Sequence, residues 1–376
     1  FLTFNILYLG EAGYGPEDIG IFQAVLVVPF ILKILLGMLS DGVNLFGLGH
    51  RKPYILIGLL TQAAIILVAP FVPVADGLGV YAALLFVGAV GMALYDTCTD
   101  GLALDTTPAD ERGLVQGIMT GARAGGILIM LVVGGWLAEN LGWPAFFWSL
   151  VVLTLLPLPL VLLVKEDPGA MRRRPFQWSA FRAFGQGGVM LVALIGLLYS
   201  FSLDGVLTFL SDHLRAAMDV SVGSIGLLVA LSMVGRILGA ASNSWLTDRV
   251  GHRQSLLIGI LLAFLACVGL ALSGQVALIA LFGLLFGLAY GYYTSVYAAV
   301  AMDFCDEHIL ASMFATFMLF VNVGTAVGQP VAGMLAENVG FGPMALIMGA
   351  INLITILFVF RIFRVKRPGV AAGVAE

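Results

Sequence analysis

The sequence predicts an all-α integral membrane protein with twelve membrane-spanning helices in two bundles of six. An apolar composition, repeated apolar runs of helical length and an internal repeat carry this prediction. Of the 376 residues, 60% are hydrophobic and only 11% are charged, and the mean hydropathy is +1.04. A soluble chain of ordinary composition carries about 25% charged residues. Apolar runs of about 20 residues are long enough to cross a bilayer as helices.

The apolar runs divide into two sets of six. The first run, before Gly10, is shorter than a span, so we expect an incomplete first helix. A polar, basic segment separates the sets, which predicts an N-terminal bundle over residues 1–164, a linker over 165–188, a C-terminal bundle over 189–364 and a tail over 365–376. The complete spans are expected near residues 19–39, 54–71, 80–104, 111–138, 144–164, 189–210, 222–246, 254–273, 276–301, 309–336 and 342–363.

The distribution of basic residues predicts the orientation. If the linker is cytoplasmic, 14 of the 18 Lys and Arg residues lie on the cytoplasmic side and only Arg215 lies outside. Cytoplasmic loops of membrane proteins carry such an excess of Lys and Arg. We therefore expect a multi-pass protein of a bacterial-type plasma (inner) membrane with a cytoplasmic C-terminus.

Two sequence motifs occur once in each half. Gly-His-Arg at 49–51 returns at 251–253, and GWLAENLG at 135–142 returns as GMLAENVG at 333–340, an offset of 198 residues. Such repeats are typical of transporters built from two related bundles.

Three aspartates, Asp96, Asp100 and Asp105, lie at the C-terminal end of the fourth predicted span. Only one of them has an aspartate at the equivalent position of the second half. Asp96 and Asp100 are four residues apart and share a helix face. The 198-residue offset retains Asp105 as Asp303, but neither of the other two acids. Two ionised carboxylates about 6 Å apart repel by about 3 kcal/mol at an effective dielectric of about 20. Our hypothesis is that Asp96 and Asp100 form a proton-coupling pair; the alternative is that one of them pairs structurally with Lys33 or Arg123.

Cations within the spans indicate the charge of a solute. Charged side chains inside a membrane are costly and usually functional. Lys33, Arg123 and Arg236 would favour an anionic solute in a central cavity, although Arg236 could equally be a packing or gating residue. The remaining candidates for solute binding, each with packing as its alternative, are Asp204, Tyr293, Asn322 and Gln329.

The repeated Gly-His-Arg loops predict a cytoplasmic gate, because each follows a span that ends in an aspartate. The expected gate residues are Asp41, Arg51, Lys52, Asp105, Arg112, Asp248, Arg249 and Arg253.

These residues carry a resemblance to a known family. The loop from Leu246 to Arg253, and its longer first-half copy over residues 39–54, resemble the loops after the second and eighth spans of the major facilitator superfamily. Asp96-x3-Asp100-Gly101-Leu102-x2-Asp105 is similar to the folate–biopterin transporters, which more usually carry Glu at the last place. Glu111-Arg112-Gly113, Arg123 and Gly134-Gly135 resemble the muropeptide permeases. The light-harvesting assembly proteins of phototrophic bacteria share the general scheme.

The resemblance implies a secondary active transporter that moves a folate-, pterin- or muropeptide-like anion by alternating access with protons, sodium being left open. An enzyme is disfavoured because the four histidines are scattered and no catalytic motif is present. A channel is disfavoured because nothing resembles a selectivity filter. The alternative is a pigment-handling or light-harvesting assembly factor that transports nothing. We expect a monomer in the lipid bilayer, with no metal, cofactor or nucleic acid.

Overall fold

The structure, a computed structural model, describes residues 2–45, 49–74, 77–107, 112–164, 182, 184–185, 187–305 and 310–364. Within these ranges the chain is helical, and they contain no strand. The helices, with one 3₁₀ turn, are α1 (Leu2–Glu11), α2 (Pro16–Ile31), α3 (Lys33–Gly42), α4 (Lys52–Val68), η2 (Ala69–Phe71), α5 (Leu78–Thr106), α6 (Arg112–Leu141), α7 (Trp143–Leu155), α8 (Leu158–Leu163), α10 (Gly187–Ala216), α11 (Val222–Leu272), α12 (Val276–Asp303), α13 (Leu310–Val339), α14 (Phe341–Leu353) and α15 (Thr355–Ile362).

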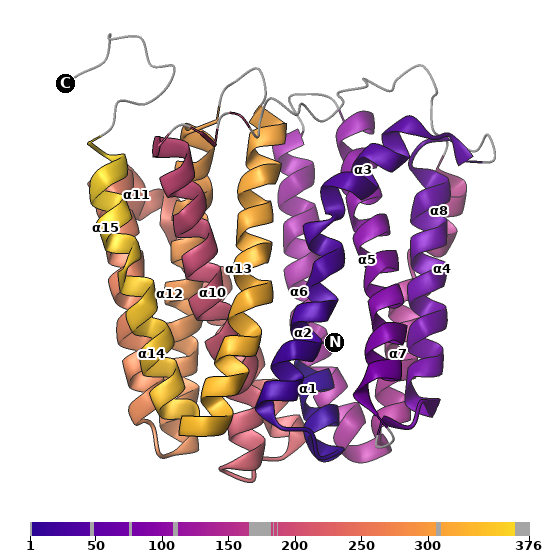
Figure 1. The fold of residues 1–376 in the computed structure, drawn as a ribbon. Helices are drawn as coiled ribbons and strands as arrows, with labels where there is room; N and C mark the ends of the chain where they lie inside the picture. The colour runs from indigo at the N-terminus through magenta and orange to yellow at the C-terminus, as the bar shows by residue number, and fades with distance from the viewer. Residues whose placement is uncertain are drawn as a thin grey trace. The chain divides into compact units, whose positions relative to one another are not determined.

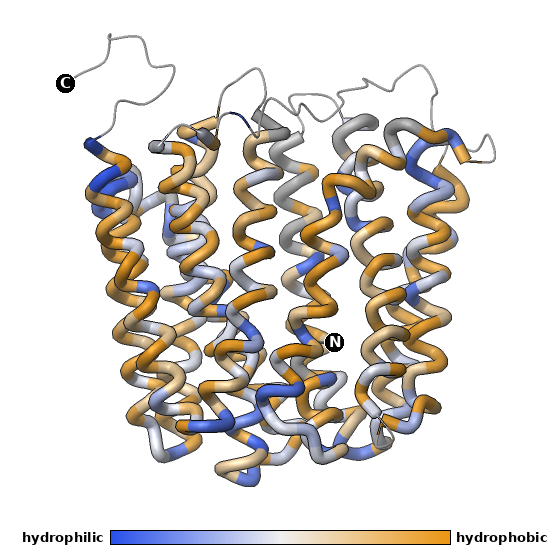
Figure 2. The backbone as a smooth tube through the Cα atoms, in the orientation of Figure 1, coloured by the Kyte–Doolittle hydropathy of each residue, from blue (hydrophilic) through white to orange (hydrophobic). Residues whose placement is uncertain are grey.

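Eleven helical segments in the described ranges are long and apolar enough to cross a membrane. This number confirms the eleven complete spans expected from the sequence, and α1, with ten residues, is the short first helix. Three spans consist of two helices each, namely α2 with α3, α7 with α8, and α14 with α15, whereas α11 contains two spans. Figure 1 shows these helices in order along the chain. They are predominantly hydrophobic along their length (Figure 2).

The helices form two compact units. Unit 1 contains most of the chain up to Leu163 together with residues 219–227, and unit 2 contains residues 15–21 and most of the chain from Gly187 onward. The start of α2 thus belongs to unit 2 and the rest of α2 to unit 1, whereas the start of α11 belongs to unit 1 and the rest of α11 to unit 2. Most of the predicted linker and all of the tail lie outside the described residues, α10 begins at Gly187 within the predicted linker, and the division into domains 1–164 and 189–364 stays a prediction.

Glycine allows close helix packing in unit 1. A Cβ atom on Gly58 of α4 would lie 2.5 Å from the carbonyl oxygen of Gly91 on α5, and one on Gly91 would lie 2.8 Å from the oxygen of Gly58. Small residues let helix backbones approach closely in lipid, where no hydrophobic effect drives helices together. The α4–α5 contact therefore depends on this glycine pair and holds α5, which carries Asp96 and Asp100, against the rest of the unit.

Unit 2 is arranged around α10, which packs against α12, α13, α14 and α15. Its span is 61% buried, the largest share of any span described. Three of the buried residues of α10 are serines, Ser200, Ser202 and Ser211. A helix that is apolar on all sides and still carries buried hydroxyls is suited to present polar groups to its neighbours.

The internal repeat extends to the backbone. Gly142 precedes α7 with φ 82° and ψ 170°, and Gly340 precedes α14 with φ 86° and ψ 166°. Gly49 and Gly251, which open the two Gly-His-Arg motifs, also have positive φ angles of 114° and 80°. Only glycine adopts such conformations readily. The motif that ends at Gly142 and Gly340 therefore adopts the same backbone conformation at that glycine in each half, and both Gly-His-Arg motifs open with a glycine of positive φ.

Replacing Gly340 with alanine should destabilise the protein by about 1–3 kcal/mol, because that backbone conformation is essentially restricted to glycine. A Cβ atom at Gly340 would meet nothing within 4 Å, so the cost would be conformational and not steric. Thermal unfolding in detergent measures the effect. The matched control is Gly283→Ala inside α12, where a Cβ atom also meets nothing, and which should raise stability by up to about 1 kcal/mol. Equal melting temperatures for the two variants would contradict this account.

Candidate functional site

A break in the second span places a lysine inside unit 1. The α2 helix contains Pro29 and ends at Ile31, and α3 begins at Lys33 after Leu32, whose φ and ψ are −80° and 2°. Proline disrupts a helix because it lacks an N–H and clashes with the preceding turn. A cation at a helix N-terminus is unfavourable, so Lys33 needs a partner elsewhere.

Four charged side chains of unit 1, Lys33, Asp96, Asp100 and Arg123, form what we call the ion-pair cluster. Lys33 Nζ lies 2.6 Å from Asp96 Oδ2 and 3.6 Å from Asp100 Oδ2. Arg123 Nη2 lies 2.5 Å from Asp96 Oδ1 and 3.9 Å from Asp100 Oδ1. The cluster joins α3, α5 and α6. The structure thus brings together all four candidates that the sequence suggested for this half.

The two carboxylates differ in how tightly they are held. Asp96 contacts both cations at hydrogen-bonding distance and its side chain is 17% exposed, whereas Asp100 is farther from both cations and 38% exposed. The two cations beside the carboxylates offset part of the repulsion between Asp96 and Asp100. The ion pairing with Lys33 and Arg123 that the sequence suggested as the alternative is present at Asp96. Asp100 is the more exposed of the two acids and therefore the more accessible to a proton.

Unit 2 contains a different arrangement around Asp204 of α10. Asp204 Oδ2 accepts hydrogen bonds from Ser200 Oγ at 2.8 Å and Thr325 Oγ1 at 2.6 Å, and Oδ1 accepts one from the Tyr290 hydroxyl. The Arg236 guanidinium lies over the Tyr290 ring, 4.2 Å from its centroid. Hydroxyl donors stabilise the ionised form of a carboxylate. Tyr290 therefore touches both the acid and the cation of this unit.

Tyr293 is part of the helix packing of unit 2. Its side chain is fully buried, its hydroxyl lies 3.4 Å from Thr355 Oγ1, and its ring centroid is 5.3 Å from that of Tyr199. Aromatic pairs at this separation stabilise packing. The geometry favours the packing alternative for Tyr293, and its role as a solute contact stays a prediction.

Asn322 and Gln329 lie on α13 on either side of Thr325. Asn322 is half-buried, and Gln329 is buried with Nε2 3.4 Å from Thr208 Oγ1 on α10. The Gln329 Oε1 atom is buried and has no hydrogen-bond partner within the described part of the chain. A buried unpaired amide oxygen can still accept a hydrogen bond from a solute.

The first-half gate residues contact neighbouring helices within unit 1. Arg51 NH1 donates a hydrogen bond to Ser40 Oγ at 2.7 Å, and a Cβ atom on Gly101 would lie 2.8 Å from the Arg51 Cζ atom. Lys52 Nζ donates to the carbonyl oxygens of Leu162 and Val164 at 2.7 and 3.0 Å. A lysine at a helix C-terminus interacts favourably with the last carbonyl groups, so Lys52 caps α8.

The second-half gate contains a histidine–aspartate pair. His252 Nδ1 lies 2.7 Å from Asp303 Oδ2, which joins the Gly-His-Arg turn to the end of α12. Nearby, burial raises the pKa of the Cys305 thiol to about 11, so this side chain adds no charge at neutral pH.

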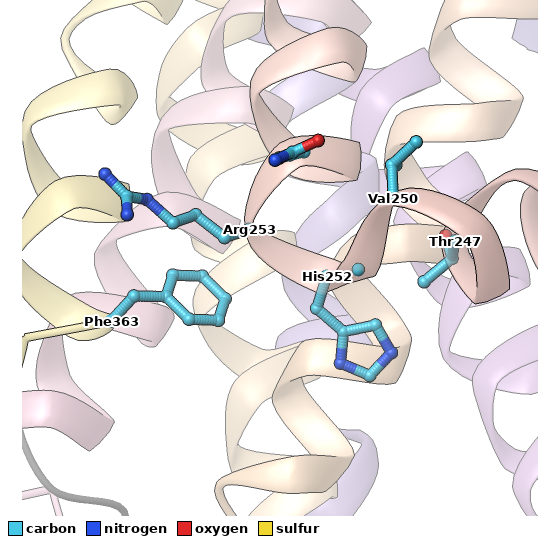
Figure 3. Close-up of a pocket in the computed structure, with 7 residues that line it drawn as sticks. Thr247, Val250, His252, Arg253 and Phe363 are labelled. Atoms are coloured by element: carbon cyan, nitrogen blue, oxygen red, sulfur yellow. The ribbon is translucent and has the colours of Figure 1, made fainter. Parts of the chain in front are cut away.

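Arginines and a pocket surround this turn. Arg249 lies 4.0 Å from the Trp245 ring centroid, and Arg253 lies 5.0 Å from that of Phe360. Figure 3 shows His252 and Arg253 pointing in different directions from the turn. A pocket of about 400 Å³ is lined by Thr247, Val250, Gly251, His252, Arg253, Gln254 and Phe363.

Some predicted gate residues cannot be placed in this scheme. The side chains of four of them lie outside the described residues, namely Asp41, Asp105, Arg112 and Asp248. Their gate roles stay predictions.

Sequence reasoning missed two of the groups that hold Asp204. Ser200 lies four residues before Asp204, and Thr325 lies three residues after Asn322 and four before Gln329. Both spacings put the hydroxyl on the same helix face as a recognised candidate. These spacings could have indicated Ser200 and Thr325 as partners, but serine and threonine are common within membrane helices and their presence alone does not predict a site.

Comparison with known proteins identifies the class. The chain belongs to the Major Facilitator Superfamily, whose family model matches residues 1–213 and 192–375. It is therefore a multi-pass membrane protein and a secondary transporter, not an enzyme.

Relatives among characterised proteins are bacterial and fungal transporters. The chain is 27% identical over 341 residues to the anhydromuropeptide permease of Escherichia coli (strain K12), a match that covers 86% of this chain and 68% of that protein. It is 26% identical over 135 residues to the arabinose-proton symporter of the same strain, covering 35% of this chain and 28% of that protein.

Solved structures show the same fold. The nucleoside transporter NupG aligns with a TM-score of 0.80 and 15% identity, covering 97% of this chain and 95% of that one. A D-xylose-proton symporter aligns with a TM-score of 0.78 and 15% identity, covering 96% and 93%. The all-α major facilitator fold expected from the sequence is confirmed.

Replacing Asp96 with asparagine should destabilise the protein more than the same change at Asp100. Asp96 contacts Lys33 and Arg123 at 2.5–2.6 Å, so its loss leaves two cations with one distant acid. We expect a cost of about 1–3 kcal/mol for Asp96→Asn and below about 1 kcal/mol for Asp100→Asn. Thermal unfolding in detergent measures both.

The control removes the cation together with the acid. The double variant Lys33→Met/Asp96→Asn should recover part of the lost stability, because it leaves fewer unpaired charges. Additive losses in the double variant would show that the ion pair contributes nothing.

Proposed function

We propose that this chain is a proton-coupled transporter that moves an anionic organic solute by alternating access. The bundles over residues 1–164 and 189–364 are the two moving bodies, in a bacterial inner membrane with the C-terminus in the cytoplasm. Superfamily membership supports the transport class, and the match to an arabinose-proton symporter supports proton coupling. Rocking of two related bundles about a midplane site is the usual mechanism for such folds.

The ion-pair cluster is the observation that carries the proposal. Two cations and two carboxylates give it no net charge. A proton on one aspartate would leave the cluster with one excess positive charge, which is costly in a site of low dielectric. A solute carboxylate bound at the same time would cancel that charge. Proton and anion thus bind most favourably together, and this mutual dependence is the requirement for symport.

Asp100 is the proposed proton acceptor, with Asp96 as the acid that keeps the cations in place. Protonation of Asp100 would weaken its attraction to Lys33 and Arg123, which then become available to the solute. The bidentate geometry of arginine suits recognition of a carboxylate. Arg123 is the most exposed member, with 59% of its side chain accessible, and is therefore the proposed first contact.

Unit 2 has proposed solute contacts of its own. Arg236, held over the Tyr290 ring, would offer a positive charge to the solute, while Asn322 and Gln329 would offer hydrogen-bonding groups. The unpaired Gln329 oxygen is compatible with a solute that carries hydroxyl or amide donors. Solutes with both carboxylate and amide groups, such as muropeptides and folates, fit these requirements, whereas pterins offer a ring amide without a carboxylate.

The similarity to the anhydromuropeptide permease makes anhydromuropeptides the first solutes to test. In proteoliposomes with an imposed pH gradient, wild-type protein should take up the solute together with protons. The Asp100→Asn variant should lose coupled uptake by at least about tenfold, because the proton site is gone while the fold is kept. Folates and pterins complete the panel, and replacing the proton gradient with a sodium gradient tests the other coupling ion.

The matched control is Asp18→Asn, which removes an exposed acid at the start of α2 and should leave uptake unchanged. Uptake that persists in Asp100→Asn with its proton movement intact would exclude Asp100 as the coupling acid. If correctly folded wild-type protein moved none of these solutes under either gradient, the proposed solute class would be wrong, and a non-transporting assembly role would be the next hypothesis to test.

A further inference from the structure

A glutamate of the GWLAENLG motif at 135–142 binds the start of a helix far away in the sequence. Glu139 of α6 accepts a hydrogen bond on Oε2 from the Gly223 backbone N–H at 2.7 Å and one from Ser221 Oγ at 3.1 Å. Ser221 in turn accepts a bond from the Ser224 N–H at 3.3 Å. The first N–H groups of a helix lack partners within the helix and carry partial positive charge. Glu139 therefore caps α11 from outside.

The second copy of the motif makes the same contact within unit 2. Glu337 of α13 accepts a hydrogen bond on Oε2 from the Glu17 backbone N–H at 2.9 Å. The residue before α2 is Gly15, which has no side chain with which to cap the helix. A Cβ atom there would lie 2.8 Å from the Glu337 carboxylate. The cap of α2 thus comes from α13.

The two contacts are related by the internal repeat. The accepting residues, Glu139 and Glu337, occupy the same place in the two motifs, 198 positions apart. The donating residues, Glu17 and Gly223, are each the second residue of their helix. A chance pair of surface contacts would not be expected to repeat in this way.

Glycines bring each pair of helices close enough for the contact. A Cβ atom on Gly20 of α2 would lie 2.6 Å from the Gln329 carbonyl oxygen of α13. A Cβ atom on Gly135 of α6 would lie 3.2 Å from the Val222 carbonyl oxygen of α11. Each glutamate is therefore aligned by a close helix crossing one turn or two away.

We propose that Glu139 and Glu337 are paired gating residues that hold the extracellular ends of α2 and α11 closed and release them when this side opens. Each capped segment belongs to one six-helix half by sequence and its glutamate belongs to the other half, although each contact lies within one compact unit. The rocking proposed above for the bundles over residues 1–164 and 189–364 would therefore break both contacts. Both glutamates are solvent-exposed, and exposed charge contacts are weak, so they can form and break in every cycle.

The two glutamate contacts lie at one end of α2 and α11, and the Gly-His-Arg turns follow the other end of the same spans. The span that begins at Val222 ends at Thr247, next to the Gly-His-Arg turn, and the span that begins at Pro16 ends at Ser40, before the other such turn. Each capped helix therefore connects a glutamate contact on one face with a gate loop on the other. The inference depends on the alternating access proposed above, but its test needs no solute.

Hydrogen–deuterium exchange of the full chain in lipid nanodiscs tests the proposal. In Glu139→Ala, exchange in residues 221–227 should rise by about tenfold, and in Glu337→Ala the same rise should appear in residues 15–21, because each helix start has lost its cap. In the double variant, exchange in residues 247–254 should fall, because opening of one face closes the other.

Matched controls are available next to each glutamate. Asn140→Ala and Asn338→Ala remove side chains whose amides donate to the Trp136 and Met334 carbonyl groups of their own helices, and should leave both regions unchanged. Glu139→Gln and Glu337→Gln keep an accepting oxygen, so they should give smaller rises in exchange. They replace the alanine variants in the test if those variants fold poorly. A rise at the helix starts without a fall in residues 247–254 would show local caps only and overturn the gating role, as would no rise at all.

Discussion

The contact of Asp96 with both Lys33 and Arg123 is the interaction on which the rest of unit 1 depends. It lets α3 begin with a lysine after the break at Leu32 and binds α6 to α5 across the same carboxylate. Charges within a bilayer are tolerated when they pair with one another or reach water. The ion-pair cluster satisfies this constraint with no net charge. The broken second span is thereby joined to α5 and α6 through paired charges.

The second half meets the same constraint in another way. Positions equivalent to Asp96 and Asp100 hold Thr294 and Ala298, and the acid of unit 2 lies instead on α10, held by three hydroxyl groups. Arg236 is stabilised by an aromatic face. The two repeated bundles thus keep the same glycine positions while their buried charged residues differ.

Much of the fold could be predicted, because span length and apolar composition are local properties of the sequence. The shared face of Asp96 and Asp100 was also predictable, since it depends only on helix spacing. Their pairing with Lys33 and Arg123, 63 and 27 residues away from Asp96, needs tertiary structure. Tyr293 shows the converse difficulty: an aromatic residue in a membrane helix gives the same sequence signal whether it faces a solute or, as here, the helix packing.

The positive φ angle at Gly251 has a mechanical consequence. This residue alone interrupts the helical backbone between the two spans of α11, which otherwise runs for 51 residues. A connection of one residue has no slack, so displacement of the eighth span must displace the ninth. It also makes this turn a poor place for protein engineering: an epitope or a fluorescent protein inserted here would uncouple the two helices, and with them the His252–Asp303 pair.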